Sequence, residues 1–185
     1  DVRYEREEDN VMVLDIAEYS ENGTEYLPRE EILRIDSSLR KKLGLTPANG
    51  YGLQAWAETD KSASAHPYLK FTFESKLAAE CFLAFEEAEE VTLNGVNVPI
   101  EICGYYVDKQ IHKIKLPNLN IGENTLIVRV PVGKTISIEN MFILGDFDVE
   151  TYGSVSRLIP KSNEISFGTI TDKGMPFYGG NLTYS

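Results

Sequence analysis

One stretch near the middle of the chain, residues 90–131, constrains the fold more than any other. Asn94 and Gly95 stand together between two apolar residues, and further apolar residues alternate with polar ones on both sides. An Asn-Gly pair in this setting is the strongest short-range signal of a β-hairpin, because a type I′ turn needs a positive φ at both central residues. The pair therefore predicts two short antiparallel strands joined by a tight turn.

The same stretch contains two more candidate strands. One is expected over residues 111–116, where Pro117 stops it, and the other covers residues 125–130 after a turn at Gly122 and Asn124. Strands this short and this closely spaced are typical of β-sandwiches and barrels. The stretch contains no catalytic signature, so it indicates the fold and leaves the function open.

The rest of the chain continues the all-β pattern. Residues 1–9 are charged and are expected to be frayed. A strand bulged at Gly145 is expected over residues 140–149. Apolar or alternating segments predict further strands over residues 10–19, 68–74, 81–86, 154–159, 165–170 and 181–184. We expect residues 1–185 to form a single β-sandwich domain, excised from a longer protein because both ends look cut.

One helix is expected, over residues 28–43, packed across an edge or an end of the sandwich. Pro28 suits the first helical position, and Gly44 is a natural stop after a basic last turn. Apolar residues spaced by three or four form one stripe, and they are Ile32, Ile35, Leu39 and Leu43. Residues 46–67 are expected to form a long loop, and such loops are usually functional or disordered.

The charge of the chain argues against two classes of partner. The formal net charge is -11, whereas nucleic acids and anionic membranes are bound by basic surfaces. No apolar run approaches the length of about eighteen residues that a membrane-spanning helix needs. We therefore expect no nucleic acid and no membrane among the partners.

Few residues are candidates for a metal site. Cys81 and Cys103 lie in apolar strand patterns with a spacing that fits no metal site, so two buried thiols are expected, with a disulfide as the alternative. Asp146, Asp148 and Glu150 alternate along one strand, which makes Asp146 and Asp148 a candidate Ca²⁺ site. The simpler interpretation is a solvent-facing strand edge, and no other cofactor is expected.

Aromatic residues suggest a ligand site. Those that fall in expected loops or at strand ends, rather than at core positions, are Tyr51, Trp56, Tyr105, Tyr106 and Tyr178. Flat rings can stack on the apolar faces of sugars while their polar tips reach hydroxyl groups. We expect the first four of these residues, together with His66, to contact a glycan. Tyrosines also plug the ends of sandwiches, and a lone histidine supports neither a zinc site nor a catalytic triad.

Residues 91–130 resemble a known family. The phrases VTLNG, GYYVDKQIHKIKLP and GENTLIVRV are similar to those of the sugar-binding β-sandwich domain of family 2 glycoside hydrolases. In those domains a strand ends in a phrase like LNG and a strand of the form G-x-N-x-L-x-V-x-V closes the unit. More loosely, NVMVLD, PREEILRIDSSLRKKLGL, FILGDFDV and GMPFYGGNLTY resemble the accessory sandwich regions of large bacterial α-L-rhamnosidase-like and β-galactosidase-like hydrolases.

The resemblance implies a galactose-binding-like jelly roll of two antiparallel sheets, and a bacterial carbohydrate-degrading parent protein. It carries over no catalytic residue, because the acid and nucleophile of such enzymes usually lie on a separate barrel domain. The first hypothesis is a non-catalytic module that binds a glycan or oligosaccharide, or that supports a neighbouring active site. The second is a structural spacer that packs against other domains of the same parent chain, and the third is an independent enzyme. The localisation stays open between bacterial cytoplasmic and exported.

Overall fold

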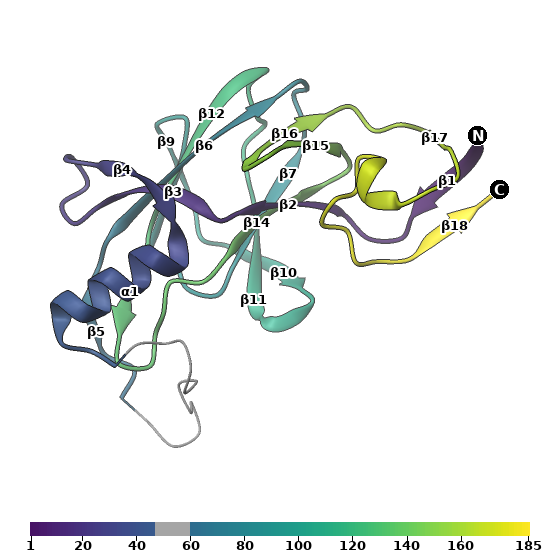
Figure 1. Cartoon of the computed structure of the whole chain (residues 1–185). Coiled ribbons are helices and arrows are strands. Elements are labelled where there is room, and N and C mark those ends of the chain that lie inside the picture. The colour runs from purple at the N-terminus through teal and green to yellow at the C-terminus, as the bar shows by residue number, and fades with distance from the viewer. Residues whose placement is uncertain (47–59) are drawn as a thin grey trace.

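The computed structural model of the protein describes residues 1–46 and 60–185, and it consists mainly of antiparallel sheets (Figure 1). The two largest sheets contribute to one main hydrophobic core. In the described part of the chain a single α-helix accompanies them. The expected class, an all-β antiparallel sandwich with one helix, is therefore confirmed.

The first layer is a five-stranded antiparallel sheet. In spatial order its strands are β10 (Ile102–Tyr106), β11 (Asp108–Lys115), β7 (Cys81–Phe85), β14 (Met141–Gly145) and β2 (Asn10–Leu14). Residues at alternate positions, such as Leu83 and Ile143, belong to the main core and are completely buried. Their neighbours along the strands, such as Phe82 and Leu144, therefore face outward, because successive side chains of a strand point to opposite faces.

The second layer is an eight-stranded sheet. Its main path consists of β15 (Asp148–Tyr152), β16 (Val155–Ile159), β6 (Tyr68–Ser75), β12 (Gly122–Arg129), β8 (Glu90–Leu93) and β9 (Val96–Val98). The hairpin of β3 (Ile16–Ser20) and β4 (Leu27–Glu31) joins it through pairing of β3 with β6. Phe71 of β6 and Leu126 and Val128 of β12 point from this layer into the main core.

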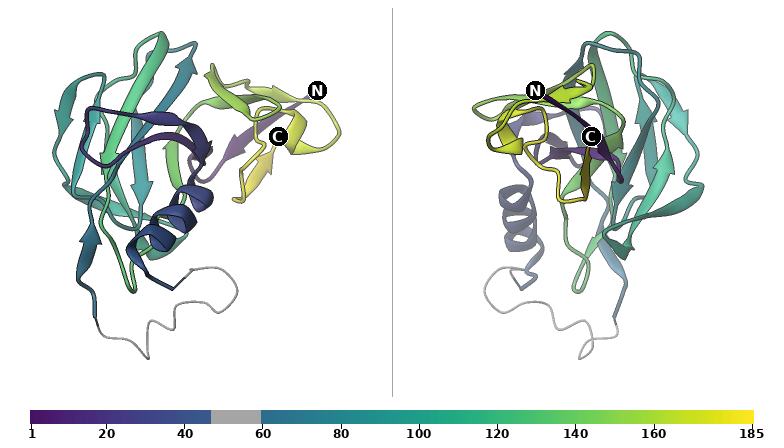
Figure 2. Two further views of the ribbon diagram at one scale, coloured as in Figure 1. Left: turned by 60° about the vertical axis from the view of Figure 1, so that its left-hand side comes forward. Right: turned by 90° about the vertical axis from the view of Figure 1, so that its right-hand side faces the viewer.

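Two small sheets complete the fold. We call the first the terminal sheet; its strands, in order, are β17 (Glu164–Ile165), β1 (Val2–Arg6) and β18 (Leu182–Tyr184), and the short helix η1 (Ile170–Asp172) lies between β17 and β18 in the sequence. It brings the two ends of the chain together beside the sandwich (Figures 1 and 2). It has a small core of its own, formed by Tyr4, Ile165, Met175 and Tyr178. The second small sheet pairs β5 (Ala63–Ala65) with β13 (Val132–Gly133).

The terminal sheet corrects two expectations from the sequence. Residues 1–9 are not frayed, because β1 pairs on both sides. The strand expected over residues 165–170 is only the two-residue β17, and Gly168, at a φ of 136°, turns the chain away before η1. No helix among the described residues is long and apolar enough to cross a membrane.

Two segments that were expected to be single strands divide between the layers. Residues 10–19 form β2 in one sheet and β3 in the other, and they change layer at Asp15. Residues 140–149 divide in the same way into β14 and the start of β15, on either side of Asp146 and Phe147. Both segments are apolar on two faces, and periodicity alone does not distinguish one doubly buried strand from two strands of different sheets.

The helix begins later than the sequence suggested. α1 covers Ile32–Leu43, whereas Pro28 lies in β4. The Glu31 carboxylate caps the helix by accepting hydrogen bonds from the backbone N–H groups of Leu33 and Arg34 at 3.0 and 3.2 Å. The expected stop is confirmed, because Gly44 adopts the left-handed conformation, with a φ of 69°. The apolar stripe packs on the main core.

The tight turn at Asn94 and Gly95 is confirmed. It joins β8 to β9, and both residues have a positive φ, of 52° and 78°. The expected turn at Asn124 is wrong, because this residue lies within β12 and is completely buried. Its side-chain amide accepts a hydrogen bond from Asn94 Nδ2 at 2.9 Å and from the Asn120 N–H at 2.8 Å. The two Asn residues therefore tie the hairpin turn to the neighbouring strand.

The expected loop over residues 46–67 lies largely outside the described residues, which resume at Asp60. Ala63–Ala65, expected as part of the loop, forms β5 instead and pairs with β13. Gly133 of β13 approaches the Ser62 carbonyl so closely that a Cβ at this position would overlap the backbone. The close approach requires glycine at position 133.

The two cysteines are free thiols in different environments. Cys81 is buried in the main core, and burial raises the pKa of its thiol to about 12. Cys103 is exposed, which corrects the expectation of two buried thiols. It lies in the edge strand β10 where the pairing register shifts between Ile102 and Gly104, and such a bulge re-aims a side chain.

We expect an alkylating reagent at about pH 8 to label Cys103 in the native protein and to spare Cys81, because the thiolate is the reactive species. Peptide mass spectrometry after short and long exposure measures this difference. In a denaturant both residues should be labelled. Rapid labelling of Cys81 in the folded protein would contradict the burial described here.

Candidate functional site

The outer face of the five-stranded sheet is unusually apolar. Val11, Ala84 and Leu144 are buried there, and four half-buried apolar residues pack against them: Phe82, Tyr106, Ile111 and Phe142. The rings of Tyr106 and Phe142 lie 5.0 Å apart at an angle of 51°. A sandwich sheet usually turns polar residues outward, so this face provides an aromatic platform beyond the needs of the core.

An open groove of about 550 Å³ lies over one end of this platform. We call it the tyrosine groove. Tyr105, Tyr106 and Val107 line it from the β10–β11 hairpin, and Val11, Lys113 and Leu144 line it from the sheet. The opposite side comes from beside the terminal sheet: Glu7, Glu8, Asp9, Tyr178, Gly179 and Gly180. The groove therefore exists only because the terminal sheet lies beside the sandwich.

Glu8 and Tyr178 are held together on that side of the groove. The Tyr178 hydroxyl lies 2.9 Å from Glu8 Oε2 and 2.7 Å from the Asn181 carbonyl oxygen. The backbone N–H of Asn181 donates to Glu8 Oε2 at 2.7 Å, and its side-chain amide donates to Oε1 at 3.1 Å. A Cβ on Gly180 would overlap Glu8 Oε2 and the Tyr178 hydroxyl, so glycine is required at this position.

These contacts fix the protonation states of both groups. The hydrogen bonds from the Asn181 backbone and from Tyr178 lower the pKa of Glu8. Burial, and then the hydrogen bond to Glu8, raises the pKa of Tyr178 to about 12. At neutral pH the groove therefore presents an ionised Glu8 and a protonated Tyr178.

The other side of the groove has a strained turn, and an ion pair joins the two sides. Val107 connects β10 to β11 with a φ of 60°, in the left-handed region that β-branched residues rarely adopt, and it is 81% exposed. Strained backbone of this kind is concentrated at functional sites. Lys113 Nζ lies 3.6 Å from Asp9 Oδ2 and 4.5 Å from the centre of the Phe82 ring.

The structure brings together some of the residues that the sequence singled out. Tyr105, Tyr106 and Tyr178 meet in the tyrosine groove, and Tyr105 is 54% exposed. Tyr51 and Trp56 lie outside the described residues, and their contact with a ligand stays a prediction.

The two histidines are not among the residues that line the groove. Nδ1 of His66 lies 2.9 Å from both carboxylate oxygens of Glu89. The ring of His112 lies edge-on to Phe85, 6.5 Å between ring centres, as expected for a strand residue.

The two carboxylates that the sequence suggested for Ca²⁺, Asp146 and Asp148, contact a cationic side chain. Arg6 donates hydrogen bonds to Asp148 Oδ1 at 2.7 Å and to Asp146 Oδ1 at 3.2 Å. Glu150 accepts a hydrogen bond from Arg157 Nε at 2.6 Å. Among the described residues no group of three or more His, Cys, Asp or Glu side chains is placed to hold a metal ion. The guanidinium of Arg6 therefore contacts both carboxylates that the sequence suggested for Ca²⁺, and Ca²⁺ binding there stays a prediction.

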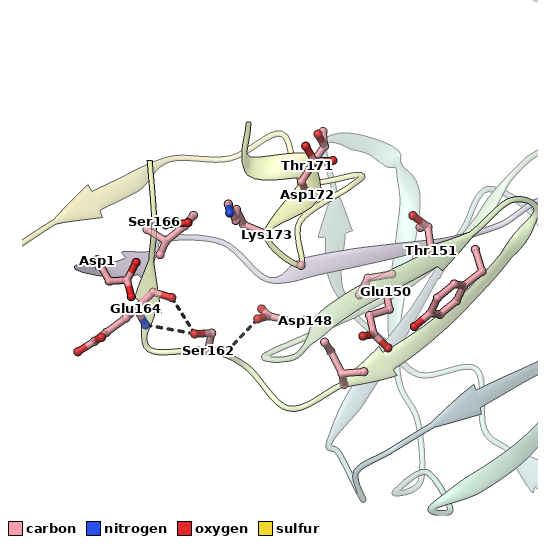
Figure 3. Close-up of a pocket in the computed structure, with 15 residues that line it drawn as sticks. Asp1, Asp148, Glu150, Thr151, Ser162, Glu164, Ser166, Thr171, Asp172 and Lys173 are labelled. Carbon is pink, nitrogen blue, oxygen red and sulfur yellow. Dashed lines mark hydrogen bonds between the residues drawn. The ribbon is translucent and has the colours of Figure 1, made fainter. Parts of the chain in front are cut away.

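A second cleft, of about 600 Å³, lies between β15 and the segment around η1 (Figure 3). Its lining is acidic, and it includes Asp148, Glu150, Glu164, Asp172 and Lys173. The Ser162 N–H donates to Asp148 Oδ2 at 2.9 Å, and the Ser162 hydroxyl donates to the Glu164 carbonyl at 2.7 Å (Figure 3). Asp148 is occupied by structural contacts, and the lining offers one tyrosine, Tyr152, so the tyrosine groove is the better candidate for a sugar.

Sequence reasoning missed residues of the platform and of the groove. Phe82 and Phe142 of the platform fall in expected strands, but the sequence did not assign them to a face. The available signal was that their strands are apolar on both faces, since in a two-layered fold the second face must meet solvent or a ligand. No local signal marks Glu8, because its role depends on Tyr178 and Asn181, which are distant in the sequence.

Comparison with known proteins gives no relative for this chain: no protein-family model, no curated protein and no solved structure matches it. The geometry of the groove is therefore the basis for the function proposed next.

Proposed function

We propose that this chain is a non-catalytic carbohydrate-binding module that binds its glycan in the tyrosine groove. One observation carries the proposal: two adjacent tyrosines of the β10–β11 hairpin and Tyr178, which is distant in the sequence, meet in one open groove on an apolar sheet face. The apolar C–H faces of a sugar ring stack on aromatic rings, and sugar hydroxyl groups need nearby polar partners. The groove offers both, because tyrosine rings lie beside the carboxylates of Glu7 and Glu8.

The carboxylates of the groove favour binding over catalysis. A glycosidase needs a carboxyl group with a raised pKa to protonate the leaving group, and a second carboxylate across the sugar. The pKa of Glu8 is lowered, and its oxygens accept three hydrogen bonds within the protein. Asp9 lies next to Lys113. In the resemblance noted above, such a module belongs to a bacterial glycoside hydrolase, and this parentage is part of the proposal.

A different observation favours the structural spacer as the second candidate. α1 and the β3–β4 hairpin enclose an apolar groove of about 600 Å³, lined by Leu27, Pro28, Ile35 and Leu39 among others. Leu27 is 58% exposed. Exposed apolar surface of this kind is typical of packing against another domain. Glycan binding and packing by α1 would use separate faces, so both can operate in one parent chain.

Replacing Tyr105 by alanine should weaken glycan binding about tenfold, because about 1.4 kcal/mol of stacking is lost with the ring. Calorimetric titration with a panel of galactose-, rhamnose- and glucosamine-containing oligosaccharides measures this change. Tyr152→Ala is the matched control: Tyr152 is also exposed, at 56%, but lines the second cleft. A folded wild type that binds nothing on the panel would refute the proposal. A loss in Tyr152→Ala alone would move the site to the second cleft.

A further inference from the structure

The side of the tyrosine groove next to the terminal sheet carries negative charge without a matching cation. Glu7, Glu8 and Asp9 follow one another between β1 and β2, and all three line the groove. Lys113, 3.6 Å from Asp9, is the cation of the lining and offsets one of these charges. Among the described residues that line the groove, two of the three carboxylates therefore have no cation beside them.

The described partners of those two carboxylates are neutral. Glu7 Oε1 accepts a long hydrogen bond of 3.4 Å from the Thr183 hydroxyl. Glu8 accepts from Tyr178 and from the backbone and side chain of Asn181. A carboxylate has roughly four acceptor positions, so Glu8 keeps capacity for one more donor after these three bonds. Its position is fixed before any ligand arrives, which reduces the entropy that binding costs.

The aromatic rings of the groove, like its carboxylates, favour a positively charged ligand. The π-face of a tyrosine ring attracts cations, and aromatic rings recognise organic ammonium groups. Tyr105 and Tyr106 stand in the groove that contains Glu7 and Glu8. An anionic sugar, such as a uronic acid, would instead bring a like charge toward these carboxylates, which is unfavourable.

Building on the glycan binding proposed above, we infer that the groove selects a positively charged sugar chain, one that carries free amino groups. An ammonium group on a sugar ring would lie beside the Glu7 and Glu8 carboxylates while the ring stacks on the tyrosines. The ligand class is then an oligomer of an amino sugar, in preference to its N-acetylated form or to an acidic chain.

Two chains that differ only in charge test the inference. We expect a glucosamine tetramer at about pH 6 and low salt to bind about tenfold more tightly than the N-acetylglucosamine tetramer of the same linkage. The ratio should fall at about 0.5 M salt, because ions screen exposed charges. Calorimetry measures both affinities on the folded full chain. Equal affinities for the two tetramers would overturn the inference and leave glycan binding standing, whereas binding of no sugar would overturn both.

Two variants with the same change in net charge show whether the preference for the amino chain depends on the groove. Glu7→Gln keeps an oxygen for the Thr183 hydroxyl and should reduce the preference for the amino chain about threefold. Glu5→Gln removes a charge from exposed Glu5 of β1, which is not among the groove residues, and should leave the ratio of affinities unchanged. An equal reduction in both variants would mean that the overall acidity of the protein attracts the amine, and would overturn selection by the groove.

Discussion

Replacing Arg40 by methionine is expected to lower the free energy of unfolding by about 3–5 kcal/mol, because it leaves a buried carboxylate without its cation. Arg40 is completely buried on α1, and its Nε donates to Asp36 Oδ2 at 2.9 Å. Its Nη2 donates to the Ile136 carbonyl at 2.7 Å, which joins α1 to the segment before β14. Equilibrium unfolding in urea measures the loss. A change below about 1 kcal/mol, the usual range of exposed pairs, would contradict the burial of this pair.

Two further variants test whether the loss of stability comes from the buried Asp36–Arg40 pair or from any substitution of an arginine on this helix. Asp36→Asn combined with Arg40→Met removes both charges, while the Asn side chain keeps an oxygen for the Ile138 N–H, now 2.9 Å from Asp36 Oδ1. We expect this double variant to be about 1–2 kcal/mol more stable than Arg40→Met alone, because no unpaired charge remains buried. Arg34→Met is the control on the same helix: its side chain is 75% exposed and should change stability by at most about 0.5 kcal/mol.

Local chemistry explains which parts of the fold the sequence predicted. The turn at Asn94 and Gly95 and the helix stop at Gly44 depend on the backbone preferences of one or two residues, and both were predicted. The buried pair on α1 was missed, because Arg40 was grouped with Lys41 and Lys42 as the basic last turn of the helix. Its spacing of four residues from Asp36 was the available signal.

Features that depend on distant parts of the chain were not predictable in this way. The change of layer at Asp15 follows from which sheet each half of the segment joins, and the terminal sheet forms by pairing the two ends of the chain. For the same reason, only one side of the candidate site could be found from the sequence. Tyr105 and Tyr106 were singled out because aromatic residues in expected loops or at strand ends are visible in the sequence, whereas the Glu8 side of the groove requires the terminal sheet to be in place.

One buried ion pair, between Arg6 and Asp148, anchors the terminal sheet to the sandwich, and a single substitution removes it. The Arg6 and Asp148 side chains are 1% and 5% exposed, and Asp148 also accepts a hydrogen bond from the Ser162 N–H. Replacing Asp148 by alanine leaves Arg6 buried without this partner, which typically costs about 3–5 kcal/mol. Asp146→Ala is the matched control, because Asp146 also contacts Arg6 but is 73% exposed, and we expect a loss below about 1 kcal/mol.

The loss in Asp148→Ala should be concentrated where the anchor acts. We expect hydrogen exchange to accelerate in β1, β17 and β18 while the amides of β7 and β14 keep their protection, because local opening requires less free energy than global unfolding. The glycan binding that we propose should weaken at the same time, since Glu8 and Tyr178 reach the groove only while the terminal sheet is docked. Faster exchange that is uniform across both large sheets would show that the anchor stabilises the whole domain instead. If the terminal sheet stays docked and the glycan still binds in this variant, the packing of Tyr4, Ile165 and Met175 suffices to form the groove.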